Sequence, residues 1–82
     1  MTIRFHKNFD RRYRKLPTEL QQRFKERSTR FISNPFDAVL RNHMLKGKFK
    51  RYRSINIGGD YRAIYKLLED GTAIFVDIGT HG

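Results

Sequence analysis

The pattern of apolar and polar positions first predicts a strand and a short helix. Residues 2–5 alternate between polar and apolar types, as in a short edge strand. From residue 7 onward the period lengthens, and Phe9, Tyr13 and Leu16 fall on one face of a helix over residues 7–16.

A second helix is predicted to begin at Pro17-Thr18 and to end near Asn34. Thr18 and Gln21 have the spacing of a capping box, in which two side chains satisfy backbone N–H groups at a helix start. Asn34 precedes a proline, and that position disfavours helical backbone. The predicted buried stripe of this helix is Leu20, Phe24 and Phe31.

The second half of the chain predicts strands. Residues 36–48 have no clear period and are interpreted as a partly ordered connection. Three runs rich in β-type residues follow, at 49–57, 61–68 and 73–78, and Gly58-Gly59-Asp60 and Glu69-Asp70-Gly71 between them are hairpin signals. The pattern predicts an α+β fold of order β-α-α-β-β-β, with an antiparallel sheet, the first strand at an edge, and both N-terminal helices packed on one face.

Length and composition suggest one basic domain with an anionic partner. A chain of 82 residues supports a single core, so residues 1–82 are expected to form one domain. The formal charge of +10 favours nucleic acid as the partner, although docking onto an acidic protein stays open. No membrane partner is expected, because we find neither a basic amphipathic anchor nor a spanning apolar run. The N-terminus reaches Arg4 before any apolar stretch forms, so we expect no secretory signal and a cytoplasmic location.

Metal and thiol chemistry find little support in the sequence. The chain has no cysteine, which excludes disulfides, thiolate metal sites and a cysteine nucleophile. His6, His43 and His81 are widely spaced and form no paired-ligand motif. We expect no metal and no cofactor.

Metal-free RNA cleavage requires only groups that the chain contains. One group must remove the proton of the 2′-hydroxyl, another must protonate the leaving oxygen, and cations must stabilise the phosphate. The candidates for proton exchange are His43, Asp60 and His81, those for phosphate binding are Lys46, Arg51, Arg53 and Arg62, and those for base stacking are Tyr52 and Tyr61.

Each candidate also has a purely structural interpretation. A single histidine near a strand end is commonly a solvated side chain, and Asp60 suits a turn for its local hydrogen bonding. Arg51 and Arg53 alternate with a tyrosine, as on an ordinary solvated strand face, and Tyr61 is a possible core residue.

Four segments and the order of the predicted elements give the whole chain a resemblance to a known family. The four segments, in order, are His43-Met44-Leu45-Lys46-Gly47, Tyr52-Arg53-Ser54-Ile55, Gly59-Asp60-Tyr61-Arg62-Ala63-Ile64-Tyr65 and Ile78-Gly79-Thr80-His81. With the element order, they resemble the RelE/ParE superfamily of type II toxin–antitoxin systems, and within it the YafQ-like mRNA endonucleases.

The resemblance implies a toxin that enters the ribosomal A site, cuts mRNA and is silenced by an antitoxin in a toxin–antitoxin hetero-oligomer. His43, Asp60 and His81 match residues that take part in proton transfer or transition-state support, with His81 expected as general acid and His43 or Asp60 as base. Arg62 matches a phosphate-contacting arginine. Lys46, Arg51 and Arg53 fall where relatives are basic.

Two other functions stay open for a chain of this resemblance. Asn56 stands where YafQ-like enzymes commonly have another histidine, which leaves room for a weakly catalytic RNA or ribosome binder. A ParE-like poison of DNA gyrase would share the fold without any chemistry of its own. The proton-transfer and phosphate-binding candidates favour the endonuclease.

Overall fold

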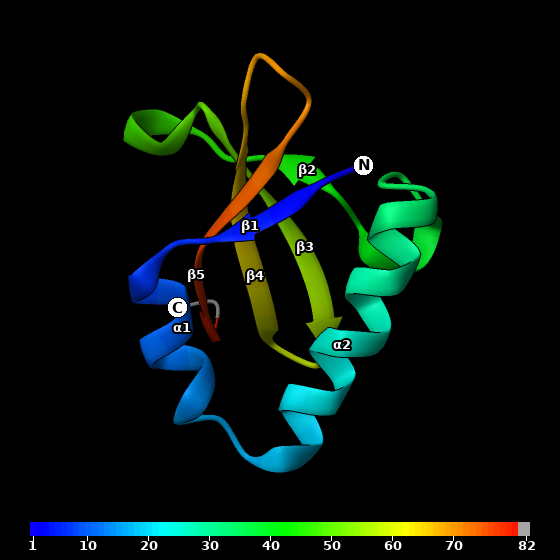
Figure 1. Ribbon diagram of the computed structural model, residues 1–82, viewed down its shortest axis with the longest axis vertical. Coiled ribbons are helices and arrows are strands. Elements are labelled where there is room, and N and C mark those ends of the chain that lie inside the picture. Colours follow the sequence, from blue (N-terminus) through cyan, green and yellow to red (C-terminus); the bar gives the residue numbers. More distant parts are fainter. Residues whose placement is uncertain (81–82) are drawn as a thin grey trace.

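The computed structural model describes residues 1–80 and contains two helices beside one sheet (Figure 1). The elements follow in the order β1 (Ile3–Phe5), α1 (Lys7–Arg14), α2 (Thr18–Ser33), β2 (His43–Met44), β3 (Tyr52–Gly58), β4 (Tyr61–Leu67) and β5 (Ala73–Thr80). Two short 3-10 helices, η1 (Ala38–Leu40) and η2 (Gly47–Phe49), flank β2. Within residues 1–80, no helix is long and apolar enough to cross a membrane.

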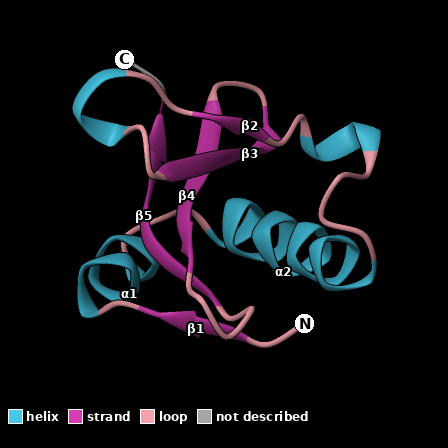
Figure 2. Cartoon of the chain, turned by 90° about the horizontal axis from the view of Figure 1, so that it is seen from above, coloured by secondary structure: helices cyan, strands magenta, loops and turns pink. Residues whose placement is uncertain are grey.

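The sheet has the strand order β1-β5-β4-β3-β2. Strands β2 to β5 pair antiparallel. Figure 2 shows α1 beside β5 and α2 beside β4, and rings from both helices contact Phe75 of β5. The predicted α+β class and the edge position of the first strand are confirmed. The prediction of an antiparallel sheet is wrong for β1, which pairs parallel to β5. These two strands are not joined by a tight hairpin, because two helices and three strands separate them along the chain.

Some element boundaries also differ from the predicted ones. Residues interpreted as a partly ordered connection include β2, which at two residues is too short to show a period. Strand β3 begins at Tyr52 rather than at residue 49, since residues 47–49 turn as η2. Helix α1 ends at Arg14, two residues earlier than predicted.

The predicted capping box at the start of α2 is wrong. Pro17 is the N-cap, and no side chain caps this end. Gln21 instead donates from Nε2 to the carbonyl oxygens of Tyr13 at 3.1 Å and Leu16 at 3.0 Å. These carbonyls lie at and just after the end of α1, so the Gln21 amide group connects the two helices.

The core lies between the helices and the sheet and is rich in aromatic rings. Phe75 of β5 is at its centre, with ring centroids 5.4 to 6.0 Å from those of five other aromatic residues. Phe24 and Phe31 are buried as predicted, whereas Leu20 is only half-buried. Fully or almost fully buried are Phe9, Phe24, Phe31, Leu40, Ile55, Ile57, Ala63, Tyr65, Ala73, Phe75 and Ile78.

Candidate functional site

The face of the sheet turned away from this core carries most of the candidate chemistry. Side chains alternate between the two faces of a strand, so the burial of Ile55 and Ala63 in the core turns their sequence neighbours the other way. We call this second face the open face. Its residues are His43 of β2, Tyr52, Ser54 and Asn56 of β3, Arg62 and Ile64 of β4, and Val76, Asp77 and Gly79 of β5.

His43 lies at the edge of the open face, paired with Ser54 across the strands. Its side chain is exposed, and ring Nδ1 is 2.8 Å from the carbonyl oxygen of Arg41. A carbonyl oxygen only accepts hydrogen bonds, so Nδ1 carries a proton and the neutral ring keeps its lone pair on Nε2. The histidine is thus oriented to accept a proton at Nε2.

Arg62 lies two strands from His43, where it is paired with Asn56 on one side and Gly79 on the other. Its Nε and Nη1 atoms are buried and have no hydrogen-bond partner among the described residues. Asn56 is engaged by the nearby turn, since its amide donates to Gly59 and its carbonyl oxygen accepts from the Gly58 N–H. These two nitrogen atoms thus lack the acceptors that a bound anion supplies to a guanidinium.

A second guanidinium reaches the same part of the open face from α1. Arg12 Nη1 is 3.1 Å from Asp77 Oδ1. A Cβ atom built on Gly79 would lie 3.5 Å from this nitrogen, and Gly79 is the cross-strand neighbour of Arg62. Arg12 and Arg62 are therefore both neighbours of Gly79, which has no side chain. Arg12 and Asp77 were not predicted from the sequence, because neither is part of a motif.

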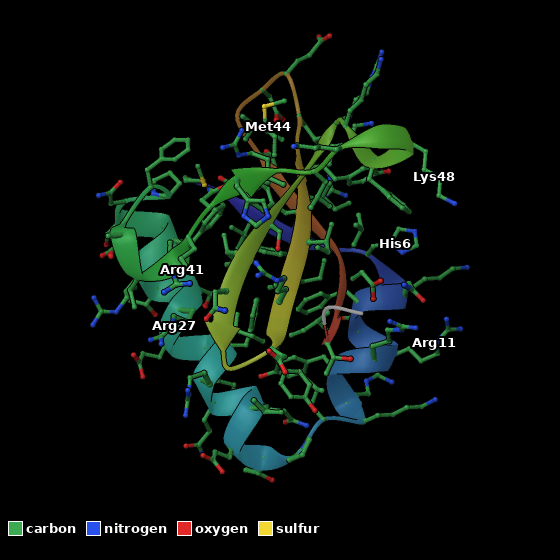
Figure 3. The ribbon with its side chains drawn as sticks, turned by 180° about the vertical axis from the view of Figure 1, so that it is seen from behind. His6, Arg11, Arg27, Arg41, Met44 and Lys48 are labelled. Atoms are coloured by element: carbon green, nitrogen blue, oxygen red, sulfur yellow. The ribbon has the colours of Figure 1, made fainter. Side chains whose placement is uncertain are left out.

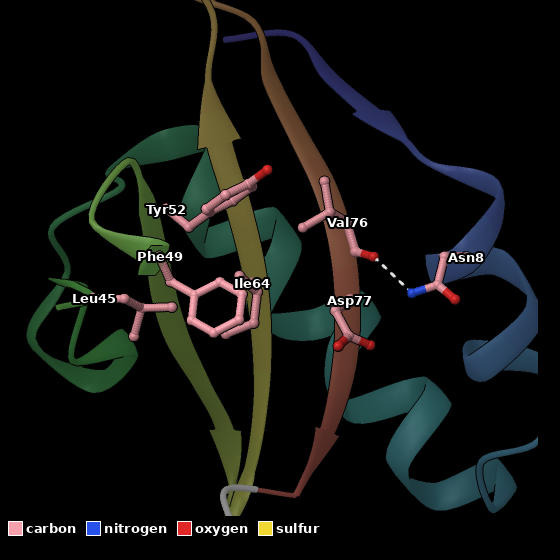
Figure 4. A pocket seen from close by; sticks show the side chains of 7 residues that line it. All are labelled: Asn8, Leu45, Phe49, Tyr52, Ile64, Val76 and Asp77. Carbon is pink, nitrogen blue, oxygen red and sulfur yellow. Dashed lines mark hydrogen bonds between the residues drawn. The ribbon is translucent and has the colours of Figure 1, made fainter. Parts of the chain in front are cut away.

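The open face also has a hollow (Figure 4), and Asp77, the partner of Arg12, is one of its lining residues. Tyr52, predicted as a stacking residue, forms one wall, and the half-exposed ring of Phe49 forms another. The floor and rim consist of Asn8, Leu45, Ile64, Val76 and Asp77. Register shifts at Val76, so that Ile64 pairs with Asp77 while the next residue pairs with Phe75. This bulge brings two successive β5 side chains to the hollow.

Two of the predicted site residues lie on the core side of the sheet. Arg53 donates from Nε to Asn42 Oδ1 at 2.8 Å and lies over the Phe36 ring at 5.3 Å. Tyr61 packs against the hydrophobic core. The structure therefore separates both residues from Arg62 and His43.

The remaining predicted residues lie in other parts of the surface or outside the described part. Arg51 lines a second hollow with Lys50 and Arg53. Asp60 is exposed in the turn between β3 and β4, and Lys46 is exposed before η2. His81 lies outside the described residues.

Basic side chains are also spread over the rest of the molecule. Arg11 on α1, Arg27 on α2 and Lys48 in η2 lie on well separated elements (Figure 3). Among residues 1–80, no group of three or more His, Cys, Asp or Glu side chains is placed to hold a metal ion. The site is thus one of cations, a histidine and aromatic rings.

Comparison with known proteins places the chain in a family. The model of the ParE toxin of the type II toxin–antitoxin system parDE matches residues 3–82. The chain belongs to this ParE toxin family. It is a type II toxin of the RelE/ParE superfamily, as the resemblance implied.

Solved structures of other toxins have the same fold as this ParE family member. A YoeB/ParE toxin from Agrobacterium tumefaciens superposes with a TM-score of 0.82 at 15% identity, with both chains covered completely. YafQ from Escherichia coli strain BL21(DE3) superposes with a TM-score of 0.77 at 29% identity, over 98% of this chain and 92% of the YafQ chain. The E. coli DinJ–YafQ complex matches with a TM-score of 0.71 at 28% identity, over 96% of this chain and 91% of the matched chain. None of the curated proteins matches the chain.

Proposed function

We propose that this toxin is a ribosome-dependent mRNA endonuclease that cuts without a metal ion. The observation that carries the proposal is the guanidinium of half-buried Arg62, whose Nε and Nη1 atoms have no acceptor in the described structure and which lies on the same face as an oriented histidine. The 29% identity to YafQ over almost the whole chain adds support.

The proposed reaction is an attack of the 2′-hydroxyl on the adjacent phosphate. His43 Nε2 takes the 2′-hydroxyl proton, with Asp60 as the alternative base, and the 2′-oxygen forms a bond to phosphorus. The bond from phosphorus to the 5′-oxygen breaks, and the leaving oxygen takes a proton from a general acid, for which His81 is the candidate. The products are a 2′,3′-cyclic phosphate and a 5′-hydroxyl end.

The cations have a separate part in this proposal. Negative charge grows on the phosphate oxygens as the new bond forms, and the Arg62 guanidinium is proposed to stabilise it. Arg12, fixed by Asp77, supplies a second guanidinium beside the first. Lys46 and Arg51, which are exposed, are proposed to hold flanking phosphates of mRNA or ribosomal RNA.

Primer extension on a defined mRNA, with and without translating ribosomes, tests this activity. We expect cuts at A-site spacing that need ribosomes and fall at least a hundredfold in His43→Ala and Arg62→Gln proteins, since each change removes a group acting at the transition state. Arg14→Gln removes an exposed charge from the end of α1 and is the matched control. Equal cutting by all four proteins, or none by the parent, contradicts the proposal.

The neutralising partner is proposed to be a cognate antitoxin with an acidic, partly disordered segment. A charge of +10 attracts such a segment, which gains charge-assisted contacts as it orders. The complex of YafQ with DinJ shows that a relative of this fold binds a partner protein.

Inhibition of DNA gyrase is the second candidate. The observation that favours it is the family model, which is that of the ParE toxins and matches residues 3–82. A supercoiling assay with purified gyrase separates the two, because a gyrase poison stops supercoiling in the absence of ribosomes and leaves mRNA uncut.

A further inference from the structure

The hollow on the open face contains a combination of surfaces that the proposed phosphate chemistry does not need. Its floor is apolar, with Leu45, Ile64 and Val76 exposed in part to solvent. Phe49 keeps 49% of its surface exposed, although the chain is otherwise strongly polar and basic. Exposed apolar surface of this kind, beside a charged site, commonly marks a place where a ligand binds.

Two aromatic rings give this hollow the shape for a flat ligand. The Phe49 and Tyr52 rings have centroids 6.3 Å apart and planes inclined by 68°. A planar ring that stacks on one of them therefore meets the edge of the other, which is a favourable arrangement for aromatic groups. Figure 4 shows both rings lining the hollow above Ile64.

The rim of the hollow supplies hydrogen-bonding groups for a polar edge. Asn8 Nδ2 donates to the Val76 carbonyl at 3.2 Å, and this leaves its second N–H for another acceptor. Asp77 Oδ1 accepts from Arg12 and from the Ile78 N–H, so the free lone pairs of this carboxylate are on Oδ2. Lys48, whose Nζ is 5.3 Å from the Phe49 ring centroid, adds a cation beside the wall.

The hollow is also close to the proposed phosphate site. Ile64 in its floor and Arg62 are two residues apart on one strand and face, a distance of roughly 7 Å. Asp77 belongs to both sites, since it lines the hollow and pairs with Arg12. A ligand spanning both sites would combine a flat, polar-edged ring with a phosphate.

We propose that this hollow binds one unstacked base of a single-stranded RNA whose adjoining phosphate lies at Arg62 and Arg12. The inference rests on the proposed action on RNA, and it assigns Phe49 and Tyr52 to base stacking and Asn8 and Asp77 to the base edge. Stacking on aromatic side chains is a general means of holding splayed-out bases in single-stranded RNA.

A tryptophan reporter tests the site directly, because the chain has no tryptophan of its own. The probe is a six-nucleotide RNA with 2′-O-methyl riboses, which lacks the nucleophile and stays uncut. In Phe49→Trp protein we expect its addition at low salt to quench tryptophan fluorescence. Phe36→Trp is the matched control, since Phe36 is 65% exposed and contacts Arg53 on the core side of the sheet. Its fluorescence should not change.

Binding of an abasic oligonucleotide separates the base from the phosphates. We expect Phe49→Ala to weaken binding of the base-bearing RNA about tenfold, as for loss of one stacked base, and to leave binding of the abasic one unchanged. Arg62→Gln should weaken both. Circular dichroism should show that Phe49→Ala is folded, because this ring lies outside the core.

Two results overturn the inference. The first is equal binding of the base-bearing and abasic oligonucleotides by the parent protein, including no binding of either. The second is unchanged tryptophan fluorescence in the Phe49→Trp protein while the fluorescence anisotropy of the labelled RNA reports binding. These results are distinct from failure of the proposed endonuclease, which is read from cleavage on ribosomes. A protein that cuts mRNA but binds abasic RNA equally well keeps the proposed function and loses the base site.

Discussion

Part of the Arg62 side chain is buried at a cost to folding. Two of its nitrogen atoms are buried without a partner among residues 1–80. An unsatisfied buried donor costs about 1–3 kcal/mol, and more when it is charged. Groups that break the rule of satisfied burial tend to be found at functional sites, where the ligand supplies the missing acceptor.

The substitution Arg62→Met should therefore separate stability from activity. Methionine keeps much of the buried volume but has no N–H groups, so we expect the free energy of unfolding to rise by about 1 kcal/mol while ribosome-dependent cleavage is lost. Urea denaturation followed by circular dichroism measures the first effect. A loss of stability greater than about 1 kcal/mol would mean that the guanidinium is satisfied in solution.

Residue chemistry was enough to select candidates from the sequence. The face of the sheet on which each candidate lies was only partly predictable. Arg53 and Arg62 are both arginines within predicted strands, yet they lie on opposite faces because of strand register. A shift of one residue in register moves a side chain to the other face. Tyr61 and Tyr52 are separated in the same way, and only Tyr52 lines the hollow.

Among the elements, those with many residues in one period were predicted well. Helix α2 begins at Thr18 and ends at Ser33, within a residue of the predicted limits. Strand β2 was missed because two residues define no period, and the bulge at Val76 was missed because it depends on pairing between strands. Both irregular features adjoin the open face, so the candidate site was harder to predict than the core.

The turn between β4 and β5 predicts a dependence of stability on pH. The Thr72 N–H donates to Asp70 Oδ1 at 2.9 Å, and hydrogen bonds from Thr72 hold the pKa of this exposed carboxyl below its usual 3.8. Because the folded protein favours the ionised form, the stabilisation is present above about pH 4 and is lost as pH falls through the folded pKa.

The variant Asp70→Asn keeps a turn-forming side chain that cannot titrate. We expect it to be slightly less stable than the parent at neutral pH and to approach the parent's stability as the pH drops below about 4. Thermal melts over this range measure the difference. Parallel stability curves for the two proteins would show that the carboxylate charge contributes nothing to the turn.

For the whole molecule, the dominant electrostatic property is its excess of positive charge. The chain has eighteen lysines and arginines against eight acidic residues. The ion pairs in the described structure involve four arginines, Arg12, Arg23, Arg27 and Arg30, and lie mostly at exposed positions. Exposed pairs contribute little, so repulsion among the remaining cations is expected to outweigh them.

Salt should consequently stabilise this fold. Raising NaCl from about 50 to about 500 mM shortens the Debye length from roughly 14 to roughly 4 Å, so we expect the thermal midpoint to rise by a few degrees. Sucrose at equal osmolality controls for effects unrelated to charge. A midpoint that falls with salt would mean that attractive pairs dominate.

The parallel pairing of β1 with β5 has a consequence for the time at which the protein folds. Residues 3–5 pair with residues 73–75, so the first strand has no neighbour until nearly the whole domain has been synthesised. Phe5 also stacks on Phe75, whose ring is at the centre of the core. Contacts this distant in sequence form late. A nascent chain therefore completes neither its core nor the β5 side of its open face until its last strand has been made.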